Sequence, residues 1–294
     1  FFFFFKQKTA YEFYMGDWIS DVCSSDLVSL HNGSVTVRAW NRDAVQVTSD
    51  DDRTPRVNLS AGSVSVGPSG RYGTGSADLV INAPAWMSLS INGVGLDITV
   101  DGMKGGANLE TVQGDVELRN AEGTLTLESV EGSVTIENAT GRVDASSVND
   151  DVLLTNIAGE IRAESTNGDV RLEKIRSASV EASTINGDIT FDGPVREGGR
   201  YALSTHDGDL WMTVPEGSSA TVSVSTFSGS FESDFPVSLE RGQRTKRRFT
   251  FVLGGGSARV DLESFSGDVR LVRPGGRGSS MEHGKNKDKD HDEN

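Results

Sequence analysis

The chain has 294 residues, with 43 Asp and Glu against 28 Lys and Arg, which gives a formal net charge of −15 at pH 7. This balance argues against a nucleic-acid partner, because phosphate binding needs a basic face. No stretch reaches the roughly 18–20 consecutive apolar residues of a membrane helix, so no membrane-spanning segment is expected in the given chain. Four His and one Cys leave little material for a zinc site or a Cys/His nucleophile pair.

Residues 1–27 resemble the in-frame translation of sequencing adapters rather than native protein. The segment contains the strings FFFFF, KQKTAYE and DWISDVCSSDL. A signal peptide is the alternative interpretation, but no basic region precedes the phenylalanines and polar residues follow them. We therefore expect 1–27 to be an artefact, so that Cys23 is not native and any export signal is lost with the true N-terminus.

Short alternating runs follow in the next segment, 28–95. Apolar and polar residues alternate at 34–37, 45–47, 64–66 and 79–81, which predicts strands. We expect 28–95 to form N-terminal capping strands and the first coils of the repeat that follows. Such a cap is needed because the open end of a repeat array exposes unpaired strand edges.

A nine-residue repeat fills the segment 96–192. Glycine recurs at intervals of nine or a multiple of nine from Gly105 to Gly168, and Asp150 stands at the one missing position. With the glycine as position zero, positions two and four are apolar in every unit from Leu96 onward. Side chains two residues apart share one face of a strand, whereas a helix needs a spacing of three and four. Each unit is therefore predicted to be a short strand followed by a turn.

Three further positions refine the unit. Position zero is glycine because the chain reverses there and glycine takes positive φ without penalty, and Asp150 is a tolerable substitute. Position seven is apolar in every unit except at Thr166, and we expect it inside a corner. Position six alternates with a period of 18, so we interpret 18 residues as one coil with two strands, with Asn in a column at one edge and Ser along the other: Asn120, Ser129, Asn138, Ser147, Asn156 and Ser165.

The units lengthen over 193–273. Related phrases centre on Gly187, Gly208, Gly229 and Gly267, so longer solenoid coils are expected there. An insertion at 236–256 is expected to form a basic hairpin that carries Arg241, Arg244, Lys246, Arg247 and Arg248. The last segment, 274–294, is almost entirely polar and is expected to be a disordered tail, in which His283 and His291 are solvated.

The predicted fold class is all-β: a parallel β-solenoid with about two strands per 18-residue coil, an N-terminal β cap and a disordered C-terminal tail. The recurrent phrase Gly-Asp-Val-x-Leu at Gly114, Gly168 and Gly267 resembles a bacterial family of candidate adhesins of unknown function, over about residues 30–273. The resemblance implies a largely extracytoplasmic protein. It brings no catalytic residues with it.

Calcium binding is one alternative, because nine-residue Gly-Asp repeats also build calcium-binding β-rolls. Those rolls carry two turn glycines and a carboxylate in each unit. Here each unit has one glycine, and Asp follows it only at some positions, such as Asp115, Asp169 and Asp188. We interpret these three as turn residues bonded to nearby backbone N–H groups, and a calcium-stabilised β-roll stays as an alternative.

A carbohydrate-active β-helix enzyme, a polysaccharide lyase or a glycosidase, is the other alternative. Its catalysis needs two carboxylates across a cleft, whereas the outward positions here mix acidic, basic and hydroxyl side chains, which favours a solvated face. His206 beside Asp207 is interpreted as a turn residue. Aromatic residues can stack on sugars, but packing against the caps is the preferred interpretation for Trp40, Trp86, Trp211, Phe227, Phe231 and Phe265.

We therefore predict a non-enzymatic, acidic β-solenoid of the cell envelope, periplasm or cell exterior that acts as an adhesin, scaffold or interaction surface. No catalytic, cofactor-binding or metal-binding residue is predicted, and no cofactor is expected. The partner is expected to be a surface ligand, either a carbohydrate or another protein, and not a nucleic acid.

Overall fold

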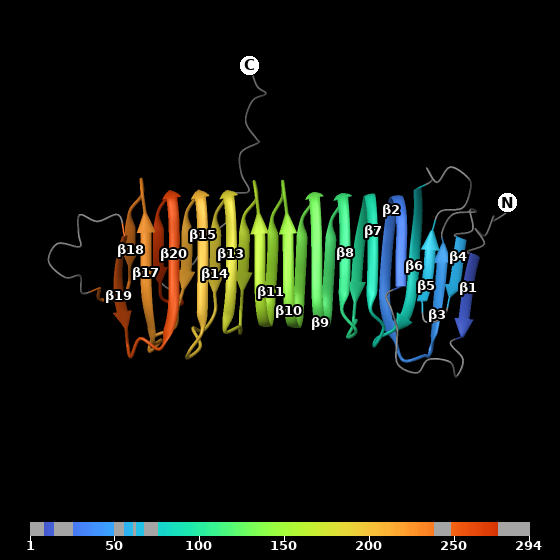
Figure 1. Cartoon of the computed structure of the whole chain (residues 1–294), viewed down its shortest axis with the longest axis horizontal. Helices are drawn as coiled ribbons and strands as arrows, with labels where there is room; N and C mark the ends of the chain where they lie inside the picture. The colour runs from blue at the N-terminus through green and yellow to red at the C-terminus, as the bar shows by residue number, and fades with distance from the viewer. Residues whose placement is uncertain are drawn as a thin grey trace, which may run out of the picture.

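The computed structural model describes residues 9–14, 26–49, 56–60, 63–67, 76–237 and 248–275, with side chains described over 31–49, 78–237 and 248–275. Every helix or strand element in these ranges is a β-strand. The strands stack side by side along one long axis (Figure 1). The predicted all-β class is confirmed.

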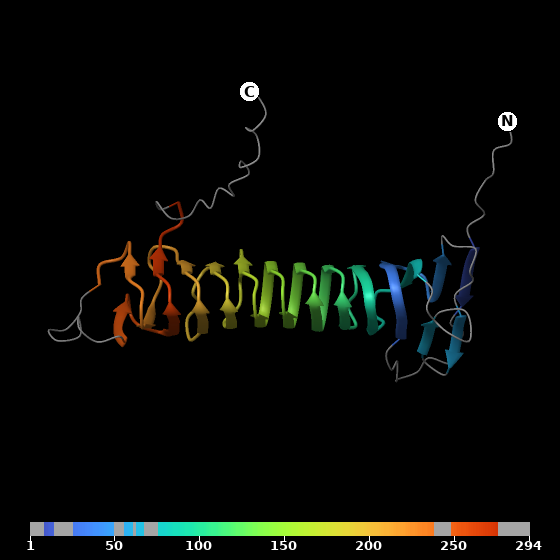
Figure 2. The same cartoon turned by 90° about the horizontal axis from the view of Figure 1, so that it is seen from above.

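Each coil contributes one strand to each of two faces, which appear as two rows of strands when seen from above (Figure 2). Face 1, toward the viewer in Figure 1, comprises the first half of β7 (Leu89–Asp101), β8 (Ala107–Gln113), the second halves of β9 (Val116–Glu131), β10 (Val134–Ser147) and β11 (Val152–Ser165), then β13 (Ser179–Asn186), β15 (Arg200–Asp207), β20 (Ala258–Ser266) and β17 (Ala220–Thr226). Face 2 comprises the second half of β7, the first halves of β9 to β11, then β12 (Val170–Glu173), β14 (Ile189–Asp192), β16 (Leu210–Thr213), β21 (Val269–Val272) and β18 (Phe231–Ser233).

The strands of each face are parallel and in register. Val134 pairs with Val116 on face 2, and Val143 pairs with Leu125 on face 1, so neighbouring coils are offset by 18 residues. The offset grows to 21 residues where Ile189 pairs with Leu210. The predicted parallel β-solenoid with two strands per coil is therefore confirmed.

Two different edges connect the faces. At the turn edge, the upper edge in Figure 1, the chain passes from face 1 to face 2 through a short turn such as 132–133. At the bend edge it passes from face 2 to face 1 while one strand, such as β10, continues through the bend. The aliphatic side chains of positions two and four fill the space between the faces, as Leu118, Ile136 and Leu154 do with no exposed surface. Burial of such a side chain stabilises the fold by about 1.5–3 kcal/mol.

The bend edge carries the predicted asparagine column. Asn120, Asn138 and Asn156 all have a positive φ, between 53° and 57°. Asn156 Nδ2 donates to Asn138 Oδ1 at 2.6 Å, and Asn138 Nδ2 donates to Asn120 Oδ1 at 3.4 Å. Asparagine fits here because its short polar side chain tolerates the left-handed conformation better than most residues do.

Position seven is where the prediction is half wrong. At the bend edge it lies in the core: Met103, Ala121, Ala139, Ile157 and Ile175 are at most 2% exposed. At the turn edge it points to solvent: Val112, Val130 and Val148 are about 40% exposed. The difference between the two edges comes from the residue at position six. A left-handed Asn turns the next side chain inward, whereas an extended Ser or Thr keeps the strand alternation, points inward itself and leaves position seven outside.

The expected reason for glycine at position zero, a positive φ, holds at the bend edge and at Gly114 of the turn edge but not at turn-edge glycines such as Gly132. At the bend edge Gly141 has a φ of 127°, and a Cβ on it would collide with the Gly123 carbonyl oxygen. At the turn edge Gly132 is required by close stacking, because a Cβ there would collide with the Gly114 carbonyl oxygen. Asp150 does not adopt a positive φ, so its interpretation as a left-handed substitute is wrong.

The order of the coils in the stack differs from their order in the chain. At the C-terminal end β20 lies between β15 and β17, and β21 lies between β16 and β18. The outer coil is completed by β19 (Arg248–Leu253), which pairs antiparallel with β17. The phrase around Gly267 therefore lies between those around Gly208 and Gly229.

The N-terminal end is also interleaved. Strand β2 (Asp26–Trp40) lies between β7 and β6 (Ser76–Pro84), parallel to both. The remaining strands pair beyond it: β3 (Ala44–Ser49) with β6, β1 (Thr9–Tyr14) with β3, and the hairpin of β4 (Arg56–Ser60) and β5 (Ser63–Gly67) with β2. The expected tail beyond residue 275 and the basic residues at 241–247 lie outside the described residues.

Gly141→Ala is expected to lower the free energy of unfolding by at least about 2 kcal/mol, because the backbone conformation at this position is nearly restricted to glycine and the new Cβ meets backbone. Gly198→Ala is the matched control: Gly198 also has a positive φ, of 70°, but nothing lies within 4 Å of its Cβ position. It should cost only about 1 kcal/mol. Urea unfolding measures both variants, and equal losses would contradict the stacking argument.

Leu262→Ala is expected to loosen the outer coil selectively, because buried Leu262 of β20 pairs with Leu203 on one side and Val224 on the other. Leu154→Ala, at a buried position in the middle of the stack, is the control. Each should cost about 2–5 kcal/mol. Hydrogen exchange should show lost amide protection in β17 and β18 for the first variant only. Unchanged protection in β17 would contradict the interleaved order.

Candidate interaction surface at the turn edge

From Ser129 onward, a hydroxyl of each coil bonds to a backbone carbonyl of the neighbouring coil at the turn edge. Ser147 Oγ donates to the Gly132 oxygen at 2.9 Å. The same bond recurs from Ser129 to Gly114, Ser165 to Asp150, Thr184 to Gly168, Thr205 to Gly187, Ser264 to Gly208 and Thr226 to Gly267. A buried carbonyl without a partner is costly, so these hydroxyls stabilise the stack. The structure thus places the predicted Ser column opposite the Asn column.

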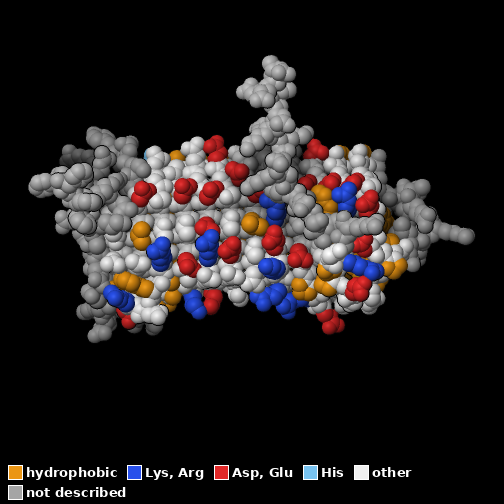
Figure 3. Space-filling view, turned by 180° about the vertical axis from the view of Figure 1, so that it is seen from behind, with side chains coloured by type: hydrophobic (Ala, Val, Ile, Leu, Met, Phe, Trp, Pro, Cys, Tyr) orange, Lys and Arg blue, Asp and Glu red, His pale blue; other side chains and the backbone are white. Residues whose placement is uncertain are grey.

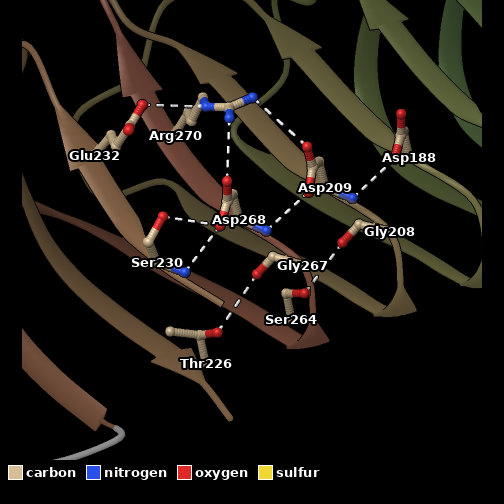
Figure 4. A network of polar contacts seen from close by, with 10 residues as sticks. All are labelled: Asp188, Gly208, Asp209, Thr226, Ser230, Glu232, Ser264, Gly267, Asp268 and Arg270. Atoms are coloured by element: carbon tan, nitrogen blue, oxygen red, sulfur yellow. Dashed lines mark hydrogen bonds and ion pairs between the residues drawn. The ribbon is translucent and has the colours of Figure 1, made fainter. Parts of the chain in front are cut away.

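An aspartate ladder runs beside these hydroxyls. Each carboxylate accepts a hydrogen bond from the backbone N–H of the equivalent residue in the next coil. Asp188 Oδ1 accepts from the Asp209 N–H at 2.8 Å, Asp209 Oδ1 from Asp268 at 2.8 Å, and Asp268 Oδ1 from Ser230 at 2.9 Å (Figure 4). The ladder follows the interleaved order of the coils, and earlier in the chain it links Asp97 to Asp115, Asp115 to Ser133, Asp151 to Asp169 and Asp169 to Asp188.

The three candidate calcium ligands from the sequence, Asp115, Asp169 and Asp188, are all members of this ladder. Their backbone partners lie in the next coil rather than in their own turn. Among the described side chains, no group of three or more His, Cys, Asp or Glu is placed to hold a metal ion.

Arg270 joins three coils at the C-terminal end of the ladder (Figure 4). Its guanidinium contacts Asp268 at 3.1 Å, Glu232 at 3.2 Å and Asp209 at 3.5 Å. The same guanidinium lies over the Trp211 ring, 5.4 Å from its centroid. Trp211 therefore lies on the outer side of face 2, but an arginine already covers it.

The pKa values of two carboxylates in the ladder are shifted in opposite directions by their surroundings. Burial raises the pKa of Asp188, and the nearby charges of Asp169 and Asp209 raise it further, against the backbone hydrogen bond from Asp209. The hydrogen bonds from the Ser230 N–H and hydroxyl lower the pKa of Asp268, and Arg270 lowers it further. The Asp188 carboxylate is thus held in a conformation that disfavours its charge, whereas that of Asp268 is held in one that favours it.

An apolar column is the exposed feature of this edge. We define it as the position-seven residues of nine successive coils, which the register stacks in the order Val94, Val112, Val130, Val148, Thr166, Ile185, His206, Phe265 and Phe227. All seven of its apolar members are among the exposed large hydrophobic residues, at 38–50% exposure. Contiguous exposed apolar surface of this kind is uncommon on a protein without a partner.

The aromatic members of the column stack on one another. The Phe227 and Phe265 ring centroids are 4.6 Å apart with planes at 5°, and His206 stacks on Phe265 at 4.7 Å with planes at 11°. His206 therefore lies near the end of β15 with a ring partner, next to Asp207 in the chain, and not in the turn itself. Because the ring faces lie against each other, Phe265 does not present a face for a sugar to stack on.

The other candidate aromatic residues lie away from the column. The Trp40 Nε1–H donates to the Ala44 oxygen at 2.7 Å, and Phe231 packs against Phe249 and Phe251 of β19. Trp86 is exposed, in the turn that follows β6.

The columns that border the apolar column carry acids and no bases. Reading positions five, eight and one across the nine coils, every charged residue is Asp or Glu: Glu110, Glu128, Glu164, Glu263, Glu131, Asp207, Asp97, Asp115, Asp151, Asp169, Asp188, Asp209 and Asp268. Among the described residues no hydrogen bond or ion pair engages the carboxylates of Glu128 and Asp207. Arginines of the outer faces pair with some of these carboxylates: Arg171 with Asp151 and Asp169, Arg162 with Glu164, and Arg270 with Asp209 and Asp268. The turn edge is therefore an apolar line whose border keeps its negative charge mainly at Glu110, Glu128, Glu131, Glu263, Asp97, Asp115, Asp188 and Asp207.

The outer faces are different. On face 2 acidic and basic side chains are interspersed (Figure 3). Arg119 pairs with Glu137 at 3.3 Å and Arg171 with Asp151 at 2.7 Å, each from one coil to the next. Exposed pairs of this kind contribute at most about 1 kcal/mol each. The carboxylates of these pairs are engaged by arginines of neighbouring coils.

No helix among the described residues is long and apolar enough to cross a membrane. The fold and its turn edge define a class of protein, the stacked parallel β-solenoid with a regular exposed edge. A comparison with protein families matches residues 28–272 to the family described as Toastrack DUF4097. The match covers most of the chain, so the chain belongs to this family. The resemblance to a candidate-adhesin family of unknown function is confirmed.

Solved structures similar to this chain include candidate adhesins from Bacteroides fragilis and Parabacteroides distasonis. The first has 12% identity and a TM-score of 0.43, and covers 92% of this chain and 98% of its own. The second has 11% identity and a TM-score of 0.32, with 91% and 97% covered. A candidate cell adhesion protein from Clostridium sporogenes has 8% identity and a TM-score of 0.22, with 91% and 100% covered. A search of curated proteins found no match.

Asp188→Asn and Asp268→Asn are expected to change stability at pH 7 in opposite directions. The first should raise the free energy of unfolding, because it removes a disfavoured charge and an amide oxygen still accepts the Asp209 N–H. The penalty from Asp188 is full above its raised folded pKa and vanishes as the pH falls below the ordinary Asp pKa of about 3.9.

Asp268→Asn should lower the free energy of unfolding, because the pKa of Asp268 is lowered in the fold. Its stabilisation is full above about pH 3.9 and is lost as the pH falls through the folded pKa. Urea unfolding at pH 7 and at about pH 3 measures both effects, which should shrink at the lower pH. Effects of the same sign at pH 7 would contradict this account.

Proposed function

We propose that the protein is a non-enzymatic adhesive or scaffolding element of the cell envelope, periplasm or cell exterior, and that the turn edge is its contact surface. The observation that carries the proposal is the apolar column, which stays exposed through nine coils while the rest of each turn is engaged in bonds between coils. The proposed location rests on the family resemblance.

The architecture suits many weak contacts better than one catalytic cleft. A solenoid presents the same side-chain position once per coil, so a partner that contacts one coil can contact the next in the same way. The rigidity of the edge supports this use, since hydroxyl and carboxylate ladders fix each turn to its neighbour. A fixed surface loses little conformational entropy when it binds.

The test replaces three neighbouring members of the column. Val112→Ser, Val130→Ser and Val148→Ser together remove apolar surface without a change of charge, and are expected to reduce retention of the labelled protein on isolated bacterial envelopes at least about tenfold. The matched control carries Thr124→Ser, Thr140→Ser and Ala158→Ser at the bend edge of the same region, and should bind like the wild type. Thermal unfolding confirms that both variants fold.

Two results would contradict the proposal. One is failure of the wild-type protein to bind any envelope or envelope polymer offered to it. The other is equal retention of the turn-edge variant and the wild-type protein.

A further inference from the structure

We infer that the turn edge binds a cationic, amphipathic polypeptide segment, whose apolar side chains lie along the apolar column and whose Lys or Arg side chains reach the acidic columns on either side. The inference rests on the proposed function, because it uses the same surface, and it adds the chemistry of the partner.

The first argument is charge. Glu128 and Glu131 lie on either side of Val130, and Asp207 follows His206, so the apolar line is bordered by carboxylates through much of its length. An anionic partner would be repelled here, and a neutral one would leave the carboxylates of Glu128 and Asp207 without partners, whereas Glu131 already accepts a hydrogen bond from Gln113. Two copies of the chain placed turn edge to turn edge would bring like charges together. Charge complementarity therefore selects a basic occupant.

The second argument is the apolar line itself. A purely cationic chain such as oligolysine satisfies the carboxylates but covers the valines with hydrated ammonium groups. A segment with apolar residues at helical spacing between Lys or Arg meets both requirements at once. The edge-on stack of Phe227, Phe265 and His206 accepts aliphatic side chains against the ring edges, whereas sugar stacking needs open ring faces.

The third argument is length. Nine coils spaced about 4.8 Å apart give a column of about 38 Å. A helix rising about 1.5 Å per residue needs about 25 residues to follow it. A probe of that length can contact every coil, and a shorter one should bind more weakly in proportion.

The experiment uses a synthetic amphipathic peptide of Leu and Lys, about 25 residues long, with fluorescence anisotropy as the readout. The wild-type protein is expected to bind it at least about tenfold more tightly than an oligolysine of equal length, and to bind the peptide with Glu in place of Lys too weakly to detect. The triple variant of Val112, Val130 and Val148 to Ser should lose about tenfold in affinity for the Leu-Lys peptide, and the bend-edge control should lose nothing.

A charge variant tests the electrostatic contribution to peptide binding separately from the apolar contribution. Glu110→Gln, Glu128→Gln and Glu131→Gln together should weaken binding of the Leu-Lys peptide and flatten its dependence on salt, because fewer charges are then matched across the interface. These carboxylates belong to the acidic border and not to the aspartate ladder, so the variant should fold like the wild type. Urea unfolding verifies this.

Other outcomes overturn the inference. Oligolysine binding as tightly as the Leu-Lys peptide would leave only non-specific charge attraction, and equal binding of the Glu-containing peptide would remove the role of charge. A dimer in sedimentation that the Val-to-Ser variant dissociates would make a second copy the occupant. Envelope binding that needs the column, without peptide binding, would sink this inference and leave the proposed function standing. Peptide binding without envelope binding would contradict the proposed function and leave the peptide-binding inference standing.

Discussion

In-register hydrogen bonding between coils is the constraint on which the rest of this structure depends. Because each strand pairs with the same residues of the coil before it, a residue type that recurs every 18 positions becomes a column running along the molecule. Columns of aliphatic residues form the core, and columns of Ser, Asn and Asp link the coils at the edges. A slip by one residue would turn the buried columns outward, so the register is strongly specified.

Much of this arrangement could be predicted from the sequence, because the local pattern and the three-dimensional pattern have the same period. Val116 and Leu118 identify a buried strand face, and the alternation of Asn138 with Ser147 identifies two unlike edges. The exposed column was missed because position seven is apolar at both edges. The signal that separates them was present one residue earlier, since Ser147 keeps Val148 outside and Asn138 turns Ala139 inside.

The order of the end coils could not be predicted from the repeat. The phrases around Gly229 and Gly267 are similar, so either could stack on the coil that contains Gly208. The choice depends on a long-range pairing: β19 turns back along β17 and occupies one of its sides, which leaves the other side of β17 for β20. Nor could the aspartate ladder be assigned from spacing alone, because each carboxylate bonds to a backbone group in a different coil.

The turn edge combines a rigid frame with a surface that the frame leaves open, which is the arrangement expected of a contact element. The interleaved C-terminal coil has a mechanical consequence for such an element. Tension applied to the chain beyond Val272 acts first on β21, which is hydrogen-bonded to β16 on one side and to β18 on the other. Two ladders then share the shear load, so the strand resists extraction more than a terminal strand with a single neighbour would.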